Sequence, residues 1–160
     1  MTPTTHVVHQ QDRIAREDLI GFLNEDLAGE YQAIISYVIY SQVLKGPEYM
    51  SIAAELEVHA AEELSHALKI AKQIDYLGGM PQAVAKPVQL SSDAKEMLRF
   101  DLQNESETIA RYRQRVRQCD ALGEYAMAEE IRQILVQEQE HLIDLATALG
   151  EEVPAIPPLD

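Results

Sequence analysis

Apolar residues recur every three or four positions through most of the chain, which is the spacing that places them on one face of an α-helix. They form four long stretches, and the residues within these stretches are mostly helix formers such as Ala, Leu, Glu and Gln. Groups of Gly and Pro separate the stretches. This pattern predicts an all-α protein with helices over residues 13–45, 48–77, 92–121 and 124–149.

The connections predict how these helices pack. The first, at Gly46-Pro47, and the last, at Gly123, are short, so each pair of helices should form an antiparallel hairpin. The middle link is roughly fifteen residues long, and a link of that length can run along the bundle. Ser92 is the expected N-cap of the helix that follows. We therefore expect an antiparallel four-helix bundle with one long crossover.

Each apolar stripe is interrupted near its middle by a carboxylate, and on the second and fourth helices a histidine follows it three residues later. Residues three apart share one face of a helix, so each Glu-x-x-His pair can point at a single centre. In both hairpins the lone Glu precedes the Glu-x-x-His by 33 residues, so the hairpins are pseudo-equivalent halves. The candidate metal ligands are Glu30, Glu63, His66, Glu105, Glu138 and His141.

Two divalent cations would make this arrangement tolerable. Unpaired carboxylates are costly to bury, and four that face one another repel. Two divalent cations balance their charge, and a neutral imidazole adds a nitrogen ligand to each. Mixed oxygen and nitrogen ligands suit iron or manganese, and zinc is a third candidate. We therefore predict two metal ions per subunit, against the alternative of a solvated face that carries these residues by chance.

Composition narrows the functional classes. The chain has 160 residues, enough for one domain, and 27 acidic against 13 basic residues give it a net charge of −14. This charge disfavours a nucleic-acid partner or an anionic membrane surface and suits a protein that gathers cations. The single cysteine, Cys119, excludes an intrachain disulfide and is expected to be a buried filler. No signal peptide or membrane-spanning run is recognisable, so we expect a cytoplasmic protein.

The chain is expected to form one domain over residues 13–150. A flexible N-terminal tail over residues 1–12 would precede it, and a Pro-rich C-terminal tail over residues 151–160 would follow. His6 and His9 fall in the N-terminal tail, where we expect no metal role.

The chain resembles the ferritin-like superfamily, and bacterioferritins in particular. The resemblance covers residues 20–149. The residues that carry it are Glu30 followed by Tyr37, the Glu63-x-x-His66 pair, Leu77-Gly78-Gly79-Met80-Pro81, Glu96-Met97-Leu98-Arg99 with Asp101-Leu102 before Glu105, and Ile134-Leu135 before Glu138-x-x-His141.

The resemblance implies a role for each candidate ligand. Glu63 and Glu138 would bridge the two metals. One metal would be completed by Glu30 and His66, and the other by Glu105 and His141.

Two tyrosines accompany the ligands. The resemblance identifies Tyr37 as the site tyrosine of the family. Tyr112 lies seven residues after Glu105, as Tyr37 lies seven after Glu30. Each could hydrogen-bond a metal-bound carboxylate or shuttle an electron, and the alternative is packing with a satisfied hydroxyl.

Departures from bacterioferritins limit the resemblance. Their haem is held by a Met just after the second-helix Glu, where this chain has Leu64, so we expect no haem. The 22 residues after Glu138 do not fit a full fifth helix of the kind that helps to close the 24-subunit shell. We expect a homo-oligomer, from a dimer up to a smaller cage as in Dps-like relatives.

Rubrerythrins share the ligand pattern and are the second family to consider. They tend to carry a further Glu one turn after the third-helix ligand, where this chain has Thr108, and the Cys-rich module that often accompanies them is absent. The symmetric spacing of Tyr37 and Tyr112 fits a rubrerythrin-like ancestry.

Other polar residues near the ligands have ordinary alternatives. His59 is either a ligand on an access route or, as we favour, a packed or surface histidine. Glu62 and Glu140 are expected to be solvated charges that attract cations. Asp101 could orient His66 or His141 by a hydrogen bond. Arginines alternate around the third helix without forming one basic face, so we expect them to pair with acids; they are Arg111, Arg113, Arg115 and Arg117.

By resemblance, the expected function is a ferroxidase that oxidises Fe(II) with O2 or H2O2 for iron storage or detoxification. The alternatives are a rubrerythrin-like di-iron or di-manganese peroxidase, an O2-activating oxidase without mineral storage, and a metal-stabilised scaffold without turnover. The negative charge of the chain helps to draw in Fe(II).

Overall fold

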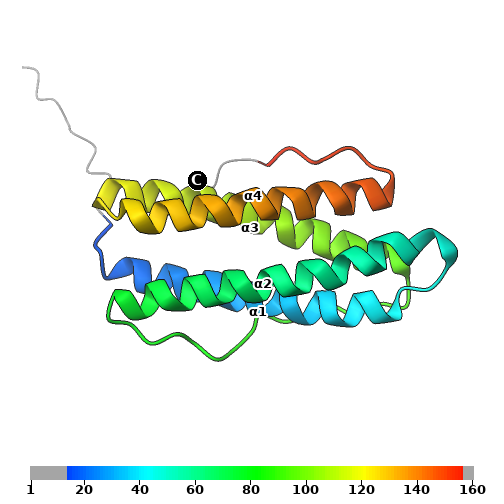
Figure 1. Cartoon of the computed structure of the whole chain (residues 1–160), viewed down its shortest axis with the longest axis horizontal. Helices are drawn as coiled ribbons and strands as arrows, with labels where there is room; N and C mark the ends of the chain where they lie inside the picture. Colours follow the sequence, from blue (N-terminus) through cyan, green and yellow to red (C-terminus); the bar gives the residue numbers. More distant parts are fainter. Residues whose placement is uncertain (1–13, 157–160) are drawn as a thin grey trace, which may run out of the picture.

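The computed structural model describes residues 14–156 and confirms the predicted fold class. Four long helices form an antiparallel bundle, and the described residues contain no strand (Figure 1). A short 3-10 helix, η1, leads into the second long helix. The elements are α1 (Asp18–Val43), η1 (Pro47–Tyr49), α2 (Met50–Tyr76), α3 (Ala94–Leu122) and α4 (Tyr125–Leu149).

All four long helices begin one to five residues later than the sequence predicts, and two of these starts have a clear local cause. α1 begins at Asp18 because the Asp18 carboxylate accepts a hydrogen bond from the backbone N–H of Ala15 at 2.8 Å, which holds the preceding residues in a turn. The N-cap of α3 is Asp93, not Ser92: the Asp93 Oδ1 accepts from the backbone N–H of Glu96 at 2.7 Å. An aspartate in this position satisfies an N–H group that the helix itself leaves unpaired.

The two hairpins pack face to face. α1 packs along α2 and α3 along α4, and between the hairpins α1 touches α3 and α2 touches α4 (Figure 1). Gly123, with a φ of 76°, allows the tight link from α3 to α4 because the left-handed backbone is strained for other residues.

The crossover between α2 and α3 runs along α1 as the sequence predicts (Figure 1). The backbone N–H of Lys86 donates to the Ala28 carbonyl at 3.0 Å, and the Gln32 amide donates to the Pro87 carbonyl at 2.6 Å. The Tyr40 hydroxyl donates to the Gln89 carbonyl. These contacts satisfy backbone groups of a long segment that has no regular secondary structure of its own.

The apolar core is divided into two clusters at opposite ends of the bundle. One includes Leu23, Ile74 and Ile131, and the other includes Leu56, Leu98 and Leu145. The layer between them, at the middle of all four helices, is made of the buried polar residues described next.

Candidate metal centre

All six candidate ligands meet in the middle of the bundle. Glu30 comes from α1, Glu63 and His66 from α2, Glu105 from α3, and Glu138 and His141 from α4. None is more than 3% exposed. The helical spacing explains this convergence, because each ligand occupies a position of the inward-facing stripe.

The ligand atoms form two overlapping groups. One contains Glu30, Glu63, His66 and Glu138, and the other contains Glu63, Glu105, Glu138 and His141; within each group, one atom per residue lies within 4.8 Å of the others. Glu63 and Glu138 belong to both groups. The geometry therefore suits two cations that share these two carboxylates.

Both histidines turn Nδ1 towards the carboxylates. His66 Nδ1 lies 3.0 Å from Glu63 Oε2 and 3.4 Å from Glu138 Oε1. His141 Nδ1 lies 2.9 Å from Glu63 Oε1 and 3.4 Å from Glu138 Oε2. Each ring nitrogen that faces the centre can therefore contribute a lone pair to a metal when its imidazole is neutral.

The centre has more buried polar atoms than hydrogen bonds to satisfy them. Among the described residues, no hydrogen-bond partner is found for Glu30 Oε2, Glu63 Oε1, Glu105 Oε2, His141 Nδ1 or either carboxylate oxygen of Glu138. Unsatisfied buried polar groups are rare and costly. Because these atoms are hard oxygen and imidazole nitrogen donors that point at one another, the residues fit a pair of divalent metal ions.

The Nε2 atoms of His66 and His141, which face away from the centre, have hydrogen-bond partners that the sequence analysis did not predict. His141 Nε2 lies 2.7 Å from Glu62 Oε2, and His66 Nε2 lies 2.8 Å from Gln137 Oε1. The Gln137 amide also donates to Glu62 Oε1 at 3.0 Å, which joins the two pairs. These acceptors hold a proton on Nε2 and keep Nδ1 turned towards the carboxylates, so Nδ1 is the atom that a metal would bind after displacing any proton there.

A positional signal could have identified both partners, because each directly precedes a ligand: Glu62 precedes Glu63, and Gln137 precedes Glu138. Glu62 is therefore more than a solvated charge, whereas Glu140 is exposed as expected. The orienting role considered for Asp101 is not observed: within the described residues it is buried and hydrogen-bonds neither histidine.

The two tyrosines occupy equivalent places in the two halves of the bundle, beside the centre. The Tyr37 hydroxyl donates to Glu105 Oε1, and the Tyr112 hydroxyl donates to Glu30 Oε1. Each therefore connects α1 and α3 through one of the lone glutamates. Burial, together with the neighbouring carboxylates, raises the pKa of both phenols well above the usual value, so both stay protonated.

Burial and crowding also change the acidities of the candidate ligands. Burial and the nearby Glu138 raise the pKa of Glu105 to about 7. Burial, Glu138 and Glu30 raise the pKa of Glu63. Burial by itself would lower the pKa of His66, but hydrogen bonds with Glu138, Glu30 and Glu63 outweigh it and raise that pKa. The carboxylate cluster thus attracts protons for the same electrostatic reason that it attracts cations.

Other residues singled out in the sequence lie around this centre. His59 is packed, at 1% exposure, and its ring stacks on that of His141 with centroids 4.0 Å apart. Cys119 is buried, and burial raises the pKa of its thiol to about 11, as suits a filler. His6 and His9 lie outside the described residues.

The arginine run on α3 is less uniform than expected. Arg113 and Arg117 are exposed, but Arg115 is only 2% exposed. The Arg115 guanidinium donates to both carboxylate oxygens of the buried Asp26, at 2.7 and 3.3 Å, and Arg111 Nε lies 3.5 Å from the same carboxylate. One buried acid on α1 thus anchors two members of the run.

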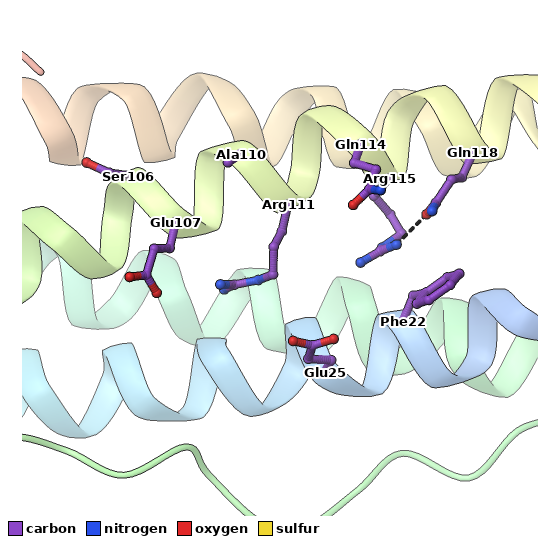
Figure 2. Close-up of a pocket in the computed structure, with 9 residues that line it drawn as sticks. All are labelled: Phe22, Glu25, Ser106, Glu107, Ala110, Arg111, Gln114, Arg115 and Gln118. Atoms are coloured by element: carbon purple, nitrogen blue, oxygen red, sulfur yellow. Dashed lines mark hydrogen bonds between the residues drawn. The ribbon is translucent and has the colours of Figure 1, made fainter. Parts of the chain in front are cut away.

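Two hollows lie between α1 and α3. The larger, of about 520 Å³, includes Phe22, Glu25 and Arg111 in its lining and lies away from the ligands (Figure 2). The smaller, of about 10 Å³, reaches Glu30, Glu63, Glu105 and Glu138. A space of this size admits one molecule about as large as water.

Comparisons with known proteins agree with the fold and the ligand pattern. A model of the ferritin-like domain family matches residues 20–152. The chain is 28% identical to a bacterioferritin of Brucella melitensis over 137 residues, covering 81% of this chain and 85% of that protein. It is 30% identical to a bacterioferritin of Desulfovibrio desulfuricans over 135 residues, covering 84% and 74% respectively.

Solved structures give the same picture. A ferritin-like di-iron-carboxylate protein of Bacillus anthracis is similar with a TM-score of 0.80 and 34% identity, covering 84% of this chain and 96% of that chain. A dodecameric thioferritin of Bacteroides fragilis, described as bacterioferritin-related, is similar with a TM-score of 0.79 and 27% identity, covering 88% and 89%. No helix among residues 14–156 has an apolar run suited to crossing a membrane.

Proposed function

Because this chain belongs to the ferritin-like domain family, we propose that it is a ferroxidase that oxidises Fe(II) for iron storage or detoxification. The observation that carries the proposal is the pair of overlapping ligand groups that share Glu63 and Glu138, with buried donor atoms left without hydrogen bonds. Similarity to bacterioferritins and to a di-iron-carboxylate protein supports iron as the metal.

Each subunit would bind two Fe(II) ions as substrate. Glu63 and Glu138 would bridge them, because these two carboxylates belong to both groups. The first ion would be completed by Glu30 and His66, and the second by Glu105 and His141. Four carboxylates neutralise two divalent ions, and the small hollow beside the glutamates is about the size of one water molecule.

The reaction removes one electron from each Fe(II). Two electrons and two protons reduce O2 to H2O2, or reduce H2O2 to two water molecules. The carboxylates hold the increased positive charge of the product ions, and the Tyr37 and Tyr112 hydroxyls keep Glu105 and Glu30 in place through hydrogen bonds that connect α1 and α3.

The protein would work as a cytoplasmic homo-oligomer. The Bacteroides fragilis neighbour is described as dodecameric. In this chain, large apolar side chains are exposed along α1 and α2, among them Val38 at 52%, Leu64 at 53% and Leu68 at 65%. Apolar surface of this kind favours contact with further subunits.

The proposal is tested by adding Fe(II) anaerobically to the purified protein and then supplying O2 or H2O2. The expected result is rapid oxidation of two Fe(II) per chain followed by retention of Fe(III) in the protein fraction. Glu63→Ala should abolish the rapid phase, and Glu57→Ala, which removes an exposed acid from the same helix, should leave it unchanged.

Other outcomes identify the alternatives. Consumption of peroxide with little retained iron would overturn storage in favour of a rubrerythrin-like peroxidase. Oxidation of an organic compound with O2 would indicate an oxidase. Metal binding with no turnover would indicate a stabilised scaffold.

A further inference from the structure

A second acidic hollow lies away from the metal centre, between the first turns of α2 and the last turns of α4, which meet at one end of the bundle (Figure 1). Its volume is about 400 Å³. The charged residues of its lining are Glu48, Glu55 and Asp144, and its lining contains no Lys or Arg. A hollow lined by charges of one sign concentrates counter-ions, so this one attracts cations.

A buried histidine lies behind two of these acids. His59 Nε2 lies 3.2 Å from Asp144 Oδ2 and 3.9 Å from Glu55 Oε1. The His59 side chain is 2% exposed, whereas those of Glu55 and Asp144 are 48% and 41% exposed. One ligand atom from each residue lies within 4.8 Å of the other two. Small side-chain movements would bring all three to about 2.0–2.2 Å from a common ion, the usual length of metal–oxygen and metal–nitrogen bonds.

The two ring nitrogens of His59 have different surroundings. Nδ1 is buried and has no hydrogen-bond partner among the described residues. Because a carboxylate only accepts hydrogen bonds, the ring proton lies on Nε2 and is donated to Asp144 Oδ2, and a cation that binds Nε2 displaces this proton. This differs from His66 and His141, whose Nε2 atoms face away from the metal centre and are held by Gln137 and Glu62.

The hollow is connected to the metal centre through shared ligand groups. His59 belongs to the surface group with Glu55 and Asp144 and to a second group with Glu62 and His141. His141 in turn belongs to the metal centre, and its ring stacks on that of His59. Potential metal-ligand atoms thus form a continuous series from the half-exposed Glu55 and Asp144 to the buried metal centre.

We propose that Glu55, His59 and Asp144 form a further divalent-cation site at the surface end of this series. Two carboxylates and a neutral imidazole balance one divalent ion and suit Fe(II), Mn(II), Co(II) or Zn(II), with water in the remaining positions. An ion bound here would be separated from the metal centre by the stacked rings of His59 and His141. Binding at this site requires no oxidation chemistry, so it does not depend on the ferroxidase activity proposed above.

The probe is Co(II), which has an anomalous X-ray signal and is not oxidised under ordinary conditions. Crystals of the full chain soaked in Co(II) should show an anomalous peak bounded by Glu55, His59 and Asp144, separate from peaks between Glu63 and Glu138. The double variant E55Q/D144N should lose the first peak and keep the others. The matched variant E57Q/E129Q removes two exposed acids from the same helices and should keep every peak.

Equilibrium dialysis against micromolar Co(II) measures how many Co(II) ions each chain binds in solution. E55Q/D144N should bind one Co(II) per chain fewer than the wild type and the matched variant. Absence of the surface peak, or equal binding by all three proteins, would overturn the proposal. Co(II) at the surface group but not between Glu63 and Glu138 would refute the proposed metal centre and support this inference, and the reverse would refute this inference alone.

Discussion

The Tyr112 hydroxyl on α3 donates a hydrogen bond to the Glu30 carboxylate on α1, and both residues are buried. The bond holds one oxygen of Glu30 and leaves Oε2 directed at His66, 3.5 Å from its Nδ1. A candidate metal ligand is therefore oriented by a residue from a different helix. Tyr37 and Glu105 repeat the relationship in the other half of the bundle.

Removing the Tyr112 hydroxyl should release the Glu30 carboxylate from its fixed orientation. Tyr112→Phe leaves Glu30 Oε1 buried without its donor, and an unmatched acceptor of this kind costs about 1–3 kcal/mol. We expect a lower free energy of unfolding and slower Fe(II) oxidation, measured by urea titration and by the rate of Fe(III) formation. Tyr125→Phe, at a 69% exposed position, is the control and should change neither. Unchanged oxidation in Tyr112→Phe would contradict a positioning role for the phenol.

The hydrogen bond between Glu62 and His141 should contribute to metal affinity. Partners of this kind hold the imidazole in the metal-binding tautomer, and their loss typically weakens binding by about 10–100-fold. Glu62→Ala should therefore raise the Kd for Co(II) at the metal centre, measured by titration. Glu140→Ala removes the exposed acid that directly precedes His141 in the chain and should have no such effect. An equal loss in both variants would point to general electrostatics rather than to this hydrogen bond.

Stability of the metal-free protein should fall as the pH rises from about 4.5 to 7. Unfolded Glu105 loses its proton near pH 4.5, whereas the folded residue keeps it until its raised pKa of about 7. The folded state then binds more protons, so each such group lowers the stability by up to about 1.4 kcal/mol per pH unit. Glu63 acts in the same direction. Asp101, whose pKa burial raises, also acts in this direction. Two groups act in the opposite direction: His59, whose pKa burial lowers, does so below pH 6.5, and Glu138, whose pKa is lowered despite burial by hydrogen bonds with the two histidines of the metal centre, does so near pH 4.5.

The predicted pH dependence of stability is tested by urea titrations at several pH values, with a chelator or with Zn(II). With chelator the free energy of unfolding should decrease across the window. With Zn(II) the decrease should shrink or reverse, because metal binding displaces protons and strengthens as the pH rises. A chelated protein that becomes more stable from pH 5 to 7 would show that the cluster does not retain protons as described.

The buried pair of Asp26 and Arg115 should be sensitive to the loss of one partner. Asp26→Ala leaves the guanidinium of Arg115 buried and unpaired, a change that typically costs about 3–5 kcal/mol. The double variant Asp26→Leu/Arg115→Met replaces the pair with apolar side chains and should recover most of that loss. Thermal and urea unfolding measure both effects. If the double variant is no more stable than Asp26→Ala, the cost does not arise from the unpaired charge.

Much of this architecture could be predicted because helical periodicity reports which residues face inwards. The same periodicity that predicted four helices placed Glu30, Glu63, Glu105 and Glu138 on the inner stripes, and the structure brings all four together. A buried acid on an apolar stripe is conspicuous in a sequence. Its chemical purpose follows from the cost of leaving it unpaired.

The contacts that could not be predicted are made mostly by residues that lie beside the inward-facing apolar stripes. Glu62 and Gln137 resemble ordinary surface residues, and only the packing of α2 against α4 shows that they hold the histidines. Asp26 and Arg115 are 89 positions apart and share no local motif. The N-cap at Asp93 instead of Ser92 depended on the local backbone, since neighbouring residues can perform the same capping role.

The division of the apolar core into two clusters affects where the bundle unfolds locally. Each cluster packs one end of the bundle, and the layer between them is made of buried polar residues. Without cations this middle layer contains buried polar atoms that have no hydrogen-bond partner among the described residues, so local unfolding is favoured there. A cation pair bound there would fasten the two ends into one cooperative unit, and amide hydrogen exchange near Glu63 and Glu138 would slow far more on metal binding than exchange at either end.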